Sequence, residues 1–176
     1  MGRSSPKASL FWPVLVAVLA VDLTTKSLAV SFLAPEFVPH SVVGDLVQLT
    51  LAYNPGVSFG IEVGPYSRVV FTTLAVIAIV VLGRLYRATG TGDRPRALAL
   101  ALICAGALGN LLDRVRSERG VVDFIDLGIG SSRFYTFNVA DVGITFGAVL
   151  LAWILWQEDR KALASAAAVP ESPSVS

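Results

Sequence analysis

Long apolar stretches alternate with short polar segments along most of this chain. The apolar stretches cover residues 10–30 (interrupted by a few polar residues), 69–86, 97–112 and 142–156. A membrane-spanning helix needs about 20 predominantly apolar residues, so this pattern predicts four transmembrane helices. The third and fourth stretches are shorter than that length. We therefore expect the charged residues at their ends, Asp113, Arg114 and Asp141, to lie at or just inside the membrane edge.

Two of the segments between these stretches have a different period. Residues 46–53 and 121–127 alternate with the period of two that is typical of a half-buried strand. Asn54-Pro55-Gly56 is a turn signal, after which residues 57–61 can return as another strand. We therefore expect residues 35–67 to be ordered, water-facing and partly β-structured.

The chain divides into a single membrane domain with a tail at each end. Residues 1–9 form a short polar tail, and residues 10–156 form the four-span domain. Residues 157–176 are charged at first and then rich in Ala, Ser and Pro, so they are expected to be disordered.

Composition supports a protein of the lipid bilayer. Of the 176 residues 54% are hydrophobic and only 15% are charged, against about 25% charged in an average globular protein. The net charge of +1 gives no basic footprint for nucleic acid. Cys104 is the only cysteine and His40 the only histidine, which argues against a disulfide framework, a zinc site or a Ser-His-Asp triad.

Lys and Arg residues indicate how the spans are oriented. With four spans, residues 1–9, 84–96 and the C-terminal tail lie on one side and carry eight of the fourteen. Residues 35–67 on the other side carry none, whereas the short 84–96 segment carries four. Because cytoplasmic loops are enriched in Lys and Arg, we expect both termini in the cytoplasm. The unusual polar residues then converge on the outer face, namely Asp22, Lys26, Asn54, Asn110, Asp113, Arg114, Asp123, Asn138 and Asp141.

Asp123 and Asp141 are the candidate catalytic residues. Two carboxylates held close together cannot both ionise cheaply, so such a pair shares a proton near neutral pH. The ionised carboxylate can take a proton from water, while the protonated one polarises the peptide bond that is cut. This chemistry needs neither a metal ion nor a nucleophilic side chain, and the sequence has no strong motif for either. Simple capping of a helix end is the main alternative explanation.

Neighbouring polar residues are expected to support this pair. Asn138 precedes Asp141 by three positions, so on a helix it can orient that carboxylate. Asn110 can hydrogen-bond between helices. Asp113 can form an ion pair with Arg114 and so tie the outer end of the third span to its neighbours.

The remaining polar residues have simpler expected roles. Asp22 can accept a hydrogen bond from the backbone or from Arg114, and Lys26 can extend its amine toward lipid headgroups. Asp126 is expected on a solvated face. Gly109 follows an alanine by four positions, a spacing that lets membrane helices approach closely.

Two other functions stay open on the residues alone. Asp113, Asp123 and Asp126 offer oxygen ligands for Mg²⁺, as in a membrane phosphotransferase, although no phosphate-binding motif accompanies them. A proton-coupled transporter would also use intramembrane carboxylates. Its carboxylates are expected at the midplane of the membrane, whereas these cluster at one edge.

Five short motifs together resemble the lipoprotein signal peptidases, also called type II signal peptidases. The motifs are Asp22-x-Thr24-Thr25-Lys26, Asn54-x-Gly56, Gly109-Asn110-x-x-Asp113-Arg114, Val121-Val122-Asp123-Phe124 and Phe137-Asn138-x-Ala140-Asp141. They come in the family's order and, with the spans, cover nearly everything from residue 10 to residue 156. Leu23, Pro55 and the Val57-Ser58 pair depart from the family's usual residues, which concerns the first outer loop and not the aspartates.

The resemblance implies an α-helical membrane protein, an aspartic endopeptidase with four transmembrane helices and a small extracytoplasmic β-sheet cradle. Family members of the bacterial cytoplasmic membrane remove signal peptides from prolipoproteins, just before a cysteine that carries diacylglycerol. Asp123 and Asp141 match the catalytic positions. The supporting positions are matched by Asp22, Lys26, Asn54, Gly109, Asn110, Asp113, Arg114 and Asn138. The implied partners are a diacylglyceryl prolipoprotein, membrane lipid and the inhibitor globomycin, with no metal, cofactor or nucleic acid.

Overall fold

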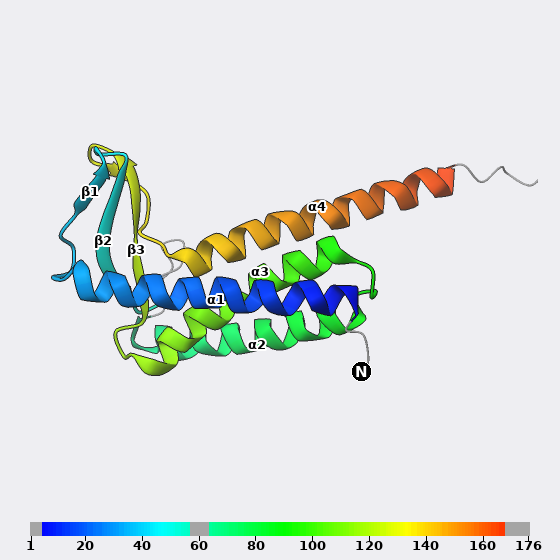
Figure 1. Cartoon of the computed structure of the whole chain (residues 1–176), viewed down its shortest axis with the longest axis horizontal. Coiled ribbons are helices and arrows are strands. Elements are labelled where there is room, and N and C mark those ends of the chain that lie inside the picture. The colour runs from blue at the N-terminus through cyan, green and yellow to red at the C-terminus, as the bar shows by residue number, and fades with distance from the viewer. Residues whose placement is uncertain (1–4, 57–63, 168–176) are drawn as a thin grey trace, which may run out of the picture.

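A computed structural model describes residues 5–56 and 64–167 of the chain (Figure 1). It contains four long helices, α1 (Pro6–Phe32), α2 (Ser67–Ala88), α3 (Arg94–Arg116) and α4 (Val139–Ala167). A short 3-10 helix, η1 (Gly64–Tyr66), comes directly before α2. Each of the four is long and apolar enough to cross a membrane. They confirm the four predicted spans. The strand predicted over residues 57–61 lies outside the described residues.

The central helix is α3, which packs against each of the other three. Small residues allow this packing, since Ala101 and Ala105 have no exposed surface and a Cβ atom at Gly106 would clash with the carbonyl oxygen of Ala140. In a lipid bilayer the hydrophobic effect does little to drive helices together. Van der Waals contacts between closely approaching backbones therefore contribute much of the packing energy. The predicted small-residue spacing of Ala105 and Gly109 is therefore confirmed as a packing surface.

Two helices extend beyond their predicted ends. α1 begins at Pro6, because the Ser5 hydroxyl accepts a hydrogen bond from the Ala8 amide and proline is well tolerated in the first helical turn. Part of the predicted N-terminal tail, residues 1–9, is therefore helical. α4 continues to Ala167, so the prediction of disorder is wrong for residues 157–167. This segment is rich in alanine, the strongest helix former.

Four antiparallel strands form a small sheet in the order β1 (His40–Val43), β2 (Val47–Asn54), β3 (Val121–Ile129) and β4 (Ser132–Arg133). The strands β2 and β3 confirm the two predicted alternating segments. β1 and β4 were not predicted, because such short strands have too few residues to display an alternation. The sheet stands at one end of the helical bundle, with its strands running across the helix axes (Figure 1).

An apolar cluster joins the sheet to the bundle. Leu51 of β2 and Phe124 of β3 pack with Ala29 and Leu33 at the end of α1. The register places Ala52 of β2 opposite Asp123 of β3. The polar residues of both strands are thereby held directly at the helix ends.

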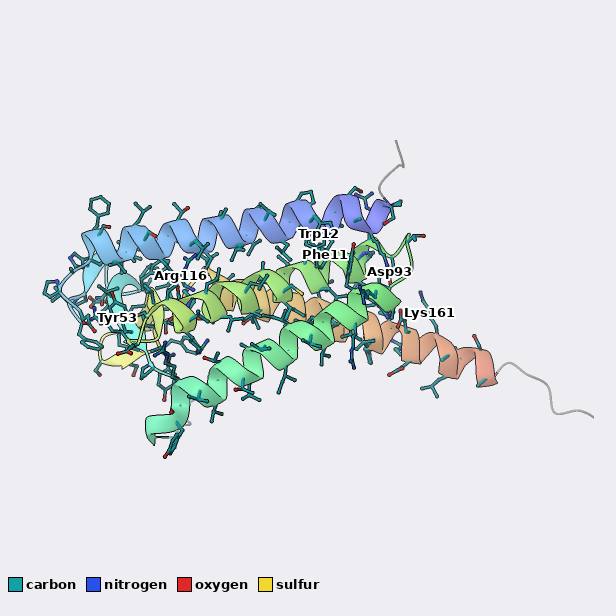
Figure 2. All side chains as sticks on the ribbon, turned by 90° about the horizontal axis from the view of Figure 1, so that it is seen from below. Phe11, Trp12, Tyr53, Asp93, Arg116 and Lys161 are labelled. Atoms are coloured by element: carbon teal, nitrogen blue, oxygen red, sulfur yellow. The ribbon has the colours of Figure 1, made fainter. Side chains whose placement is uncertain are left out.

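The opposite end of the bundle is tied by aromatic and charged contacts. The rings of Phe11 and Tyr86 lie 4.1 Å apart, and the Lys7 amine donates to the carbonyls of Tyr86 and Thr89 at the end of α2. Figure 2 shows both ends, with Tyr53 and Arg116 labelled at the sheet end and Phe11, Trp12, Asp93 and Lys161 at the other. α1 and α2 are therefore fixed to each other far from the sheet.

Candidate active site

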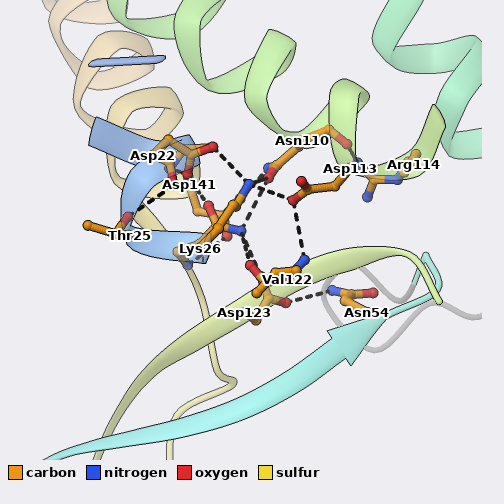
Figure 3. A network of polar contacts seen from close by, with 12 residues as sticks. Asp22, Thr25, Lys26, Asn54, Asn110, Asp113, Arg114, Val122, Asp123 and Asp141 are labelled. Atoms are coloured by element: carbon orange, nitrogen blue, oxygen red, sulfur yellow. Dashed lines mark hydrogen bonds and ion pairs between the residues drawn. The ribbon is translucent and has the colours of Figure 1, made fainter. Parts of the chain in front are cut away.

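Polar residues from both the bundle and the sheet meet at the junction between them (Figure 3). All of the site residues predicted from the sequence are brought to this junction. α1 supplies Asp22 and Lys26, β2 supplies Asn54, α3 supplies Gly109, Asn110, Asp113 and Arg114, β3 supplies Asp123, and the start of α4 supplies Asn138 and Asp141.

Asp123 is held in place by two asparagine amides. Its carboxylate accepts from Asn138 Nδ2 at 2.7 Å and from Asn54 Nδ2 at 3.3 Å. Only 4% of its surface is exposed. Its strand partner is the small Ala52, which leaves room for the carboxylate between the sheet and the bundle. The predicted importance of Asn54 therefore corresponds to a direct contact with this aspartate.

Asp141 lies in the first turn of α4 and shares two hydrogen bonds with Asn138. The Asn138 amide donates to Asp141 Oδ2 at 3.2 Å, and the Asp141 amide donates to Asn138 Oδ1 at 3.0 Å. This reciprocal arrangement is that of a capping box. Asn110 Nδ2 also donates to Asp141 Oδ1, at 2.8 Å. Helix capping thus accounts for part of Asp141's environment, whereas it gives no account of Asp123, which belongs to a strand.

Asn138 connects the two carboxylates. Its side-chain amide donates to Asp123 while its backbone amide donates to Asp141. The residue is completely buried, and its Nδ2 also lies 3.2 Å from Asn110 Oδ1. The distances therefore bring Asp123 and Asp141 to the same asparagine, as the prediction of a pair requires.

Lys26 is the buried centre of the supporting network. Its amine lies 2.9 Å from carboxylate oxygens of both Asp22 and Asp113, and it donates to Asn110 Oδ1 at 2.9 Å. Only 3% of the side chain is exposed. The prediction that Lys26 extends toward lipid headgroups is therefore wrong, because two carboxylates and an amide oxygen hold it inside the protein.

Asp113 has a different ion-pair partner from the one predicted. Its ion-pair partner is Lys26, and its Oδ2 also accepts from the Val122 amide at 3.3 Å. The predicted pair between Asp113 and Arg114 is wrong, because adjacent helical residues do not face each other. Arg114 instead donates to the Asn110 carbonyl at 3.2 Å and interacts electrostatically with Asp141 and Asp123.

Asp22 fixes the start of α4 against α1. Its Oδ1 accepts from the Ala140 amide at 2.8 Å, which confirms the predicted backbone donor and not the predicted arginine. A Cβ atom at Gly109 would clash with the other oxygen of Asp22. A glycine is therefore required on α3 at this point for α1, α3 and α4 to meet.

Two backbone donors of the network had no signal in the sequence. The amides of Ala140 and Val122 bind Asp22 and Asp113 respectively. Every residue except proline carries such a group, so only the folded chain shows which ones point at a carboxylate.

The electrostatics of the site act on Asp123. Burial, and after it the nearby charge of Asp141, raise the pKa of the Asp123 carboxyl to about 7, although the hydrogen bonds from Asn138 and Asn54 act in the opposite direction. Near neutral pH, Asp123 therefore exchanges between its protonated and ionised forms. A general acid or base works best when its pKa lies near the operating pH.

The geometry does not assemble the three carboxylates of the magnesium alternative. Asp126 was predicted on a solvated face, but it is largely buried and binds Arg133 Nε at 2.9 Å and the Thr50 hydroxyl at 3.1 Å. Asp113 is engaged by Lys26, and Asp123 by the two asparagines. Within residues 5–56 and 64–167, no group of three or more His, Cys, Asp and Glu side chains could hold a metal ion.

Comparison with known proteins decides the family. The family described as signal peptidase (SPase) II matches residues 14–157. The chain belongs to the signal peptidase II family. It is therefore a peptidase and a multi-pass bacterial membrane protein. The resemblance seen in the five motifs is confirmed.

Several proteins named "Lipoprotein signal peptidase" are similar to this chain over most of their length. The one from Moorella thermoacetica is 39% identical over 140 residues, which are 78% of this chain and 87% of that protein. The one from Hydrogenovibrio crunogenus is 34% identical over 173 residues, covering 90% of this chain and 94% of that protein. The one from Francisella tularensis subsp. novicida is 35% identical over 139 residues, covering 77% and 84%.

Two solved structures of bacterial membrane enzymes are similar to the structure described above. One superposes with a TM-score of 0.71 at 27% identity and covers 93% of this chain and 92% of the other. The second has a TM-score of 0.67 at 30% identity and covers 81% of this chain and 89% of the other. The overall fold of this chain is therefore also found in solved bacterial membrane enzymes.

Proposed function

We propose that this chain is an aspartic endopeptidase that removes signal peptides from prolipoproteins, with Asp123 and Asp141 as its catalytic pair. The observation that carries this proposal is the bridge made by Asn138, which binds both carboxylates from a completely buried position. A peptidase needs groups that activate water and protonate the leaving amine. The only histidine, His40, is an exposed residue of β1 and the only cysteine, Cys104, is buried within α3.

The surroundings of the two aspartates favour different roles. Asp141 lies at the N-terminus of α4, where the helix dipole stabilises a negative charge, and the guanidinium of Arg114 acts on it. These surroundings suit Asp141 to the role of the base that takes a proton from water. Asp123, with a pKa raised to about 7 mainly by burial, is the acid that protonates or polarises the scissile carbonyl oxygen.

The proposed reaction then follows from these roles. Water loses a proton to Asp141 as its oxygen attacks the carbonyl carbon, and Asp123 stabilises the oxygen that becomes negatively charged. The proton held by Asp141 passes to the amide nitrogen, and the C–N bond breaks. Asn138 holds the two carboxyl groups in register throughout this exchange.

A lipid-modified substrate suits the position of the pair. The site lies at the end of the four apolar helices, where the spans give way to the sheet (Figure 1). A diacylglyceryl cysteine is held at headgroup depth by its chains, since a buried acyl chain contributes about 0.8 kcal/mol per CH₂. The relatives named lipoprotein signal peptidase support the same substrate class. Because the carboxylates lie at one end and not at mid-bundle, they do not suit a transporter.

We place the site on the outer face of the bacterial cytoplasmic membrane, with both termini in the cytoplasm. The short turn between α2 and α3 and the ends of the helices beside it carry Arg84, Arg87, Arg94 and Arg96, which favours that end for the cytoplasm. Membrane lipid surrounds the helices in this arrangement. Globomycin is expected to inhibit the enzyme by binding at the aspartate pair.

Conservative replacement of each aspartate tests the catalytic assignment. Asp123→Asn and Asp141→Asn should each lower cleavage by about 10³-fold or more, because neither amide can exchange the proton. The measurement is a gel-shift assay with purified enzyme and a diacylated prolipoprotein, with and without globomycin. Asp45→Asn is the matched control, since Asp45 is an exposed residue of the β1–β2 turn. Near-normal turnover in either pair variant would show that the assignment is wrong.

Two further arms of the same assay test the substrate and the metal-free chemistry. An unlipidated prolipoprotein should be cleaved poorly, and equal cleavage of both forms would remove the role of the lipid. EDTA should leave the activity unchanged. Loss of activity on chelation, restored by Mg²⁺, would favour a metal-dependent reaction instead.

A further inference from the structure

A pocket borders the Lys26–Asp113 ion pair. It has a volume of about 370 Å³ and is lined by residues of α1 and α3 and by Val122 of β3. Ligand-binding pockets in proteins have volumes of about 300 to 1,000 Å³. Neither Asp123 nor Asp141 lines this pocket, so it is separate from the proposed catalytic pair.

The charges around the pocket include more cations than carboxylates. Its charged lining residues are Lys26, Asp113 and Arg116, so two cations face one carboxylate. The Lys26 amine is already held by Asp22 and Asp113. Arg116 is exposed, and across residues 5–56 and 64–167 its guanidinium makes no ion pair or hydrogen bond. Among the residues that the structure describes, the pocket therefore offers an anion a guanidinium that has no partner.

The position of the pocket corresponds to the level of lipid headgroups. Arg116 is the last residue of α3, and Ser27 lies in the final turns of α1, so both belong to the end of their apolar spans. Figure 2 labels Arg116 at the sheet end of the bundle. Leu23 and Val30 of α1 supply an apolar wall beside these polar groups. A guanidinium above an apolar wall matches a phosphate attached to glycerol and acyl chains.

We propose that this pocket binds the phosphodiester of an anionic phospholipid headgroup. Arg116 is the charged donor to the phosphate oxygens, since the planar guanidinium suits phosphate geometry. The exposed Ser27 hydroxyl is a second donor at the same wall. Lys26 and Asp113 line the pocket and also belong to the polar network around the aspartates. A lipid bound here would therefore contact the ion pair whose lysine donates to Asn110.

Native mass spectrometry of the full chain in detergent tests this site. Titration with phosphatidylglycerol should give a saturable bound lipid, and Arg116→Gln should weaken that binding by about tenfold, because a charge-assisted hydrogen bond is lost at a partly exposed site. Arg84→Gln is the matched control, since Arg84 is an exposed arginine of α2 outside the pocket. Equal loss in both variants, or no loss in Arg116→Gln, would overturn the proposal.

Further measurements distinguish a lipid from a soluble ligand and this pocket from the catalytic pair. Zwitterionic phosphatidylcholine should bind more weakly than phosphatidylglycerol, and equal binding would overturn the proposal of an anionic headgroup. Glycerol 1-phosphate distinguishes a lipid from a soluble phosphate ester. If it displaces bound phosphatidylglycerol in an Arg116-dependent way, the site binds phosphate but its ligand is soluble. If it does not displace the lipid, the result supports the phospholipid. Asp123→Asn should bind phosphatidylglycerol like the unaltered chain. Loss of lipid in that variant would place the lipid at the catalytic pair and overturn the separate site.

Discussion

Asn138 joins the two aspartates because a carboxamide carries both a donor and an acceptor. Its Nδ2 donates to Asp123, its Oδ1 accepts from the Asp141 amide, and its own backbone amide donates to Asp141. An aspartate at this position would lack the donor and would add a third negative charge. A leucine would leave the buried carboxylate of Asp123 without its shortest hydrogen bond. The residue type is therefore dictated by the pair that it connects.

The pH dependence of cleavage is the prediction that belongs to Asp123. The raised pKa of about 7 means that Asp123 loses its proton as the pH passes neutrality, so activity that needs the acid form should fall above pH 7. The hydrogen bond from Asn54 lowers this pKa because it stabilises the ionised carboxylate. Asn54→Ala should therefore shift the alkaline limb of kcat/KM to higher pH. The profile is measured with the lipidated substrate across pH 5 to 9.

A matched variant shows whether this shift is specific to the hydrogen bond. Gln48 lies on the same strand β2 but opposite Asp126 and not opposite Asp123. Gln48→Ala should leave the alkaline limb in place. An alkaline limb that stays put or moves to lower pH in Asn54→Ala would contradict the role given to Asp123.

At the scale of the helices, Gly109 sets how closely α3 approaches α1. The Asp22 carboxylate next to it is fixed by Lys26 and by the Ala140 amide, so it cannot easily move aside. Gly109→Ala should therefore destabilise the protein by about 1–3 kcal/mol, as overpacking does. It should also reduce cleavage, because Ala140 precedes Asp141 directly. Thermal unfolding in detergent measures the first effect and the gel-shift assay the second.

Gly83 offers the matched control for this helix prediction. It lies within α2, and a Cβ atom there meets nothing within 4 Å. Gly83→Ala should be neutral or stabilise the helix by about 0.5–1 kcal/mol, since glycine is a poor helix former. If both alanine variants unfold alike, close approach at Gly109 is not what holds α1 and α3 together.

The elements and their contacts differ in how far the sequence predicts them. The spans and the strands β2 and β3 follow from local periodicity, which the chain carries in neighbouring residues. The ion pair between Lys26 and Asp113 does not follow from local periodicity. Asp113 lies on another helix and becomes a neighbour of Lys26 only when α1 and α3 pack. The motif spacing identified Asn138 as important. Its bond to Asp123 depends on the β3 register, which no local pattern contains.

The whole molecule is asymmetric along the helix axes. The sheet and the polar network occupy one end, whereas the other end combines the start of α1, the short turn between α2 and α3 and the later turns of α4 (Figure 1). Several cations of the sheet end are neutralised within the fold, such as Lys26 by two carboxylates and Arg133 by Asp126. The cations of the other end lie on short segments beside the spans. Positive charges in such positions oppose the transfer of that segment across the membrane.

This asymmetry predicts which end faces the cytoplasm. In a Cys104→Ala background, Val43→Cys and Thr91→Cys each give one exposed thiol, at the sheet end and at the α2–α3 turn respectively. A membrane-impermeant maleimide added to intact spheroplasts should label Val43→Cys at once, and Thr91→Cys only after permeabilisation. The Cys104→Ala chain itself controls for background labelling, since it has no cysteine. The reverse pattern would place the aspartate pair in the cytoplasm, where an exported prolipoprotein with its lipid in the outer leaflet cannot reach it.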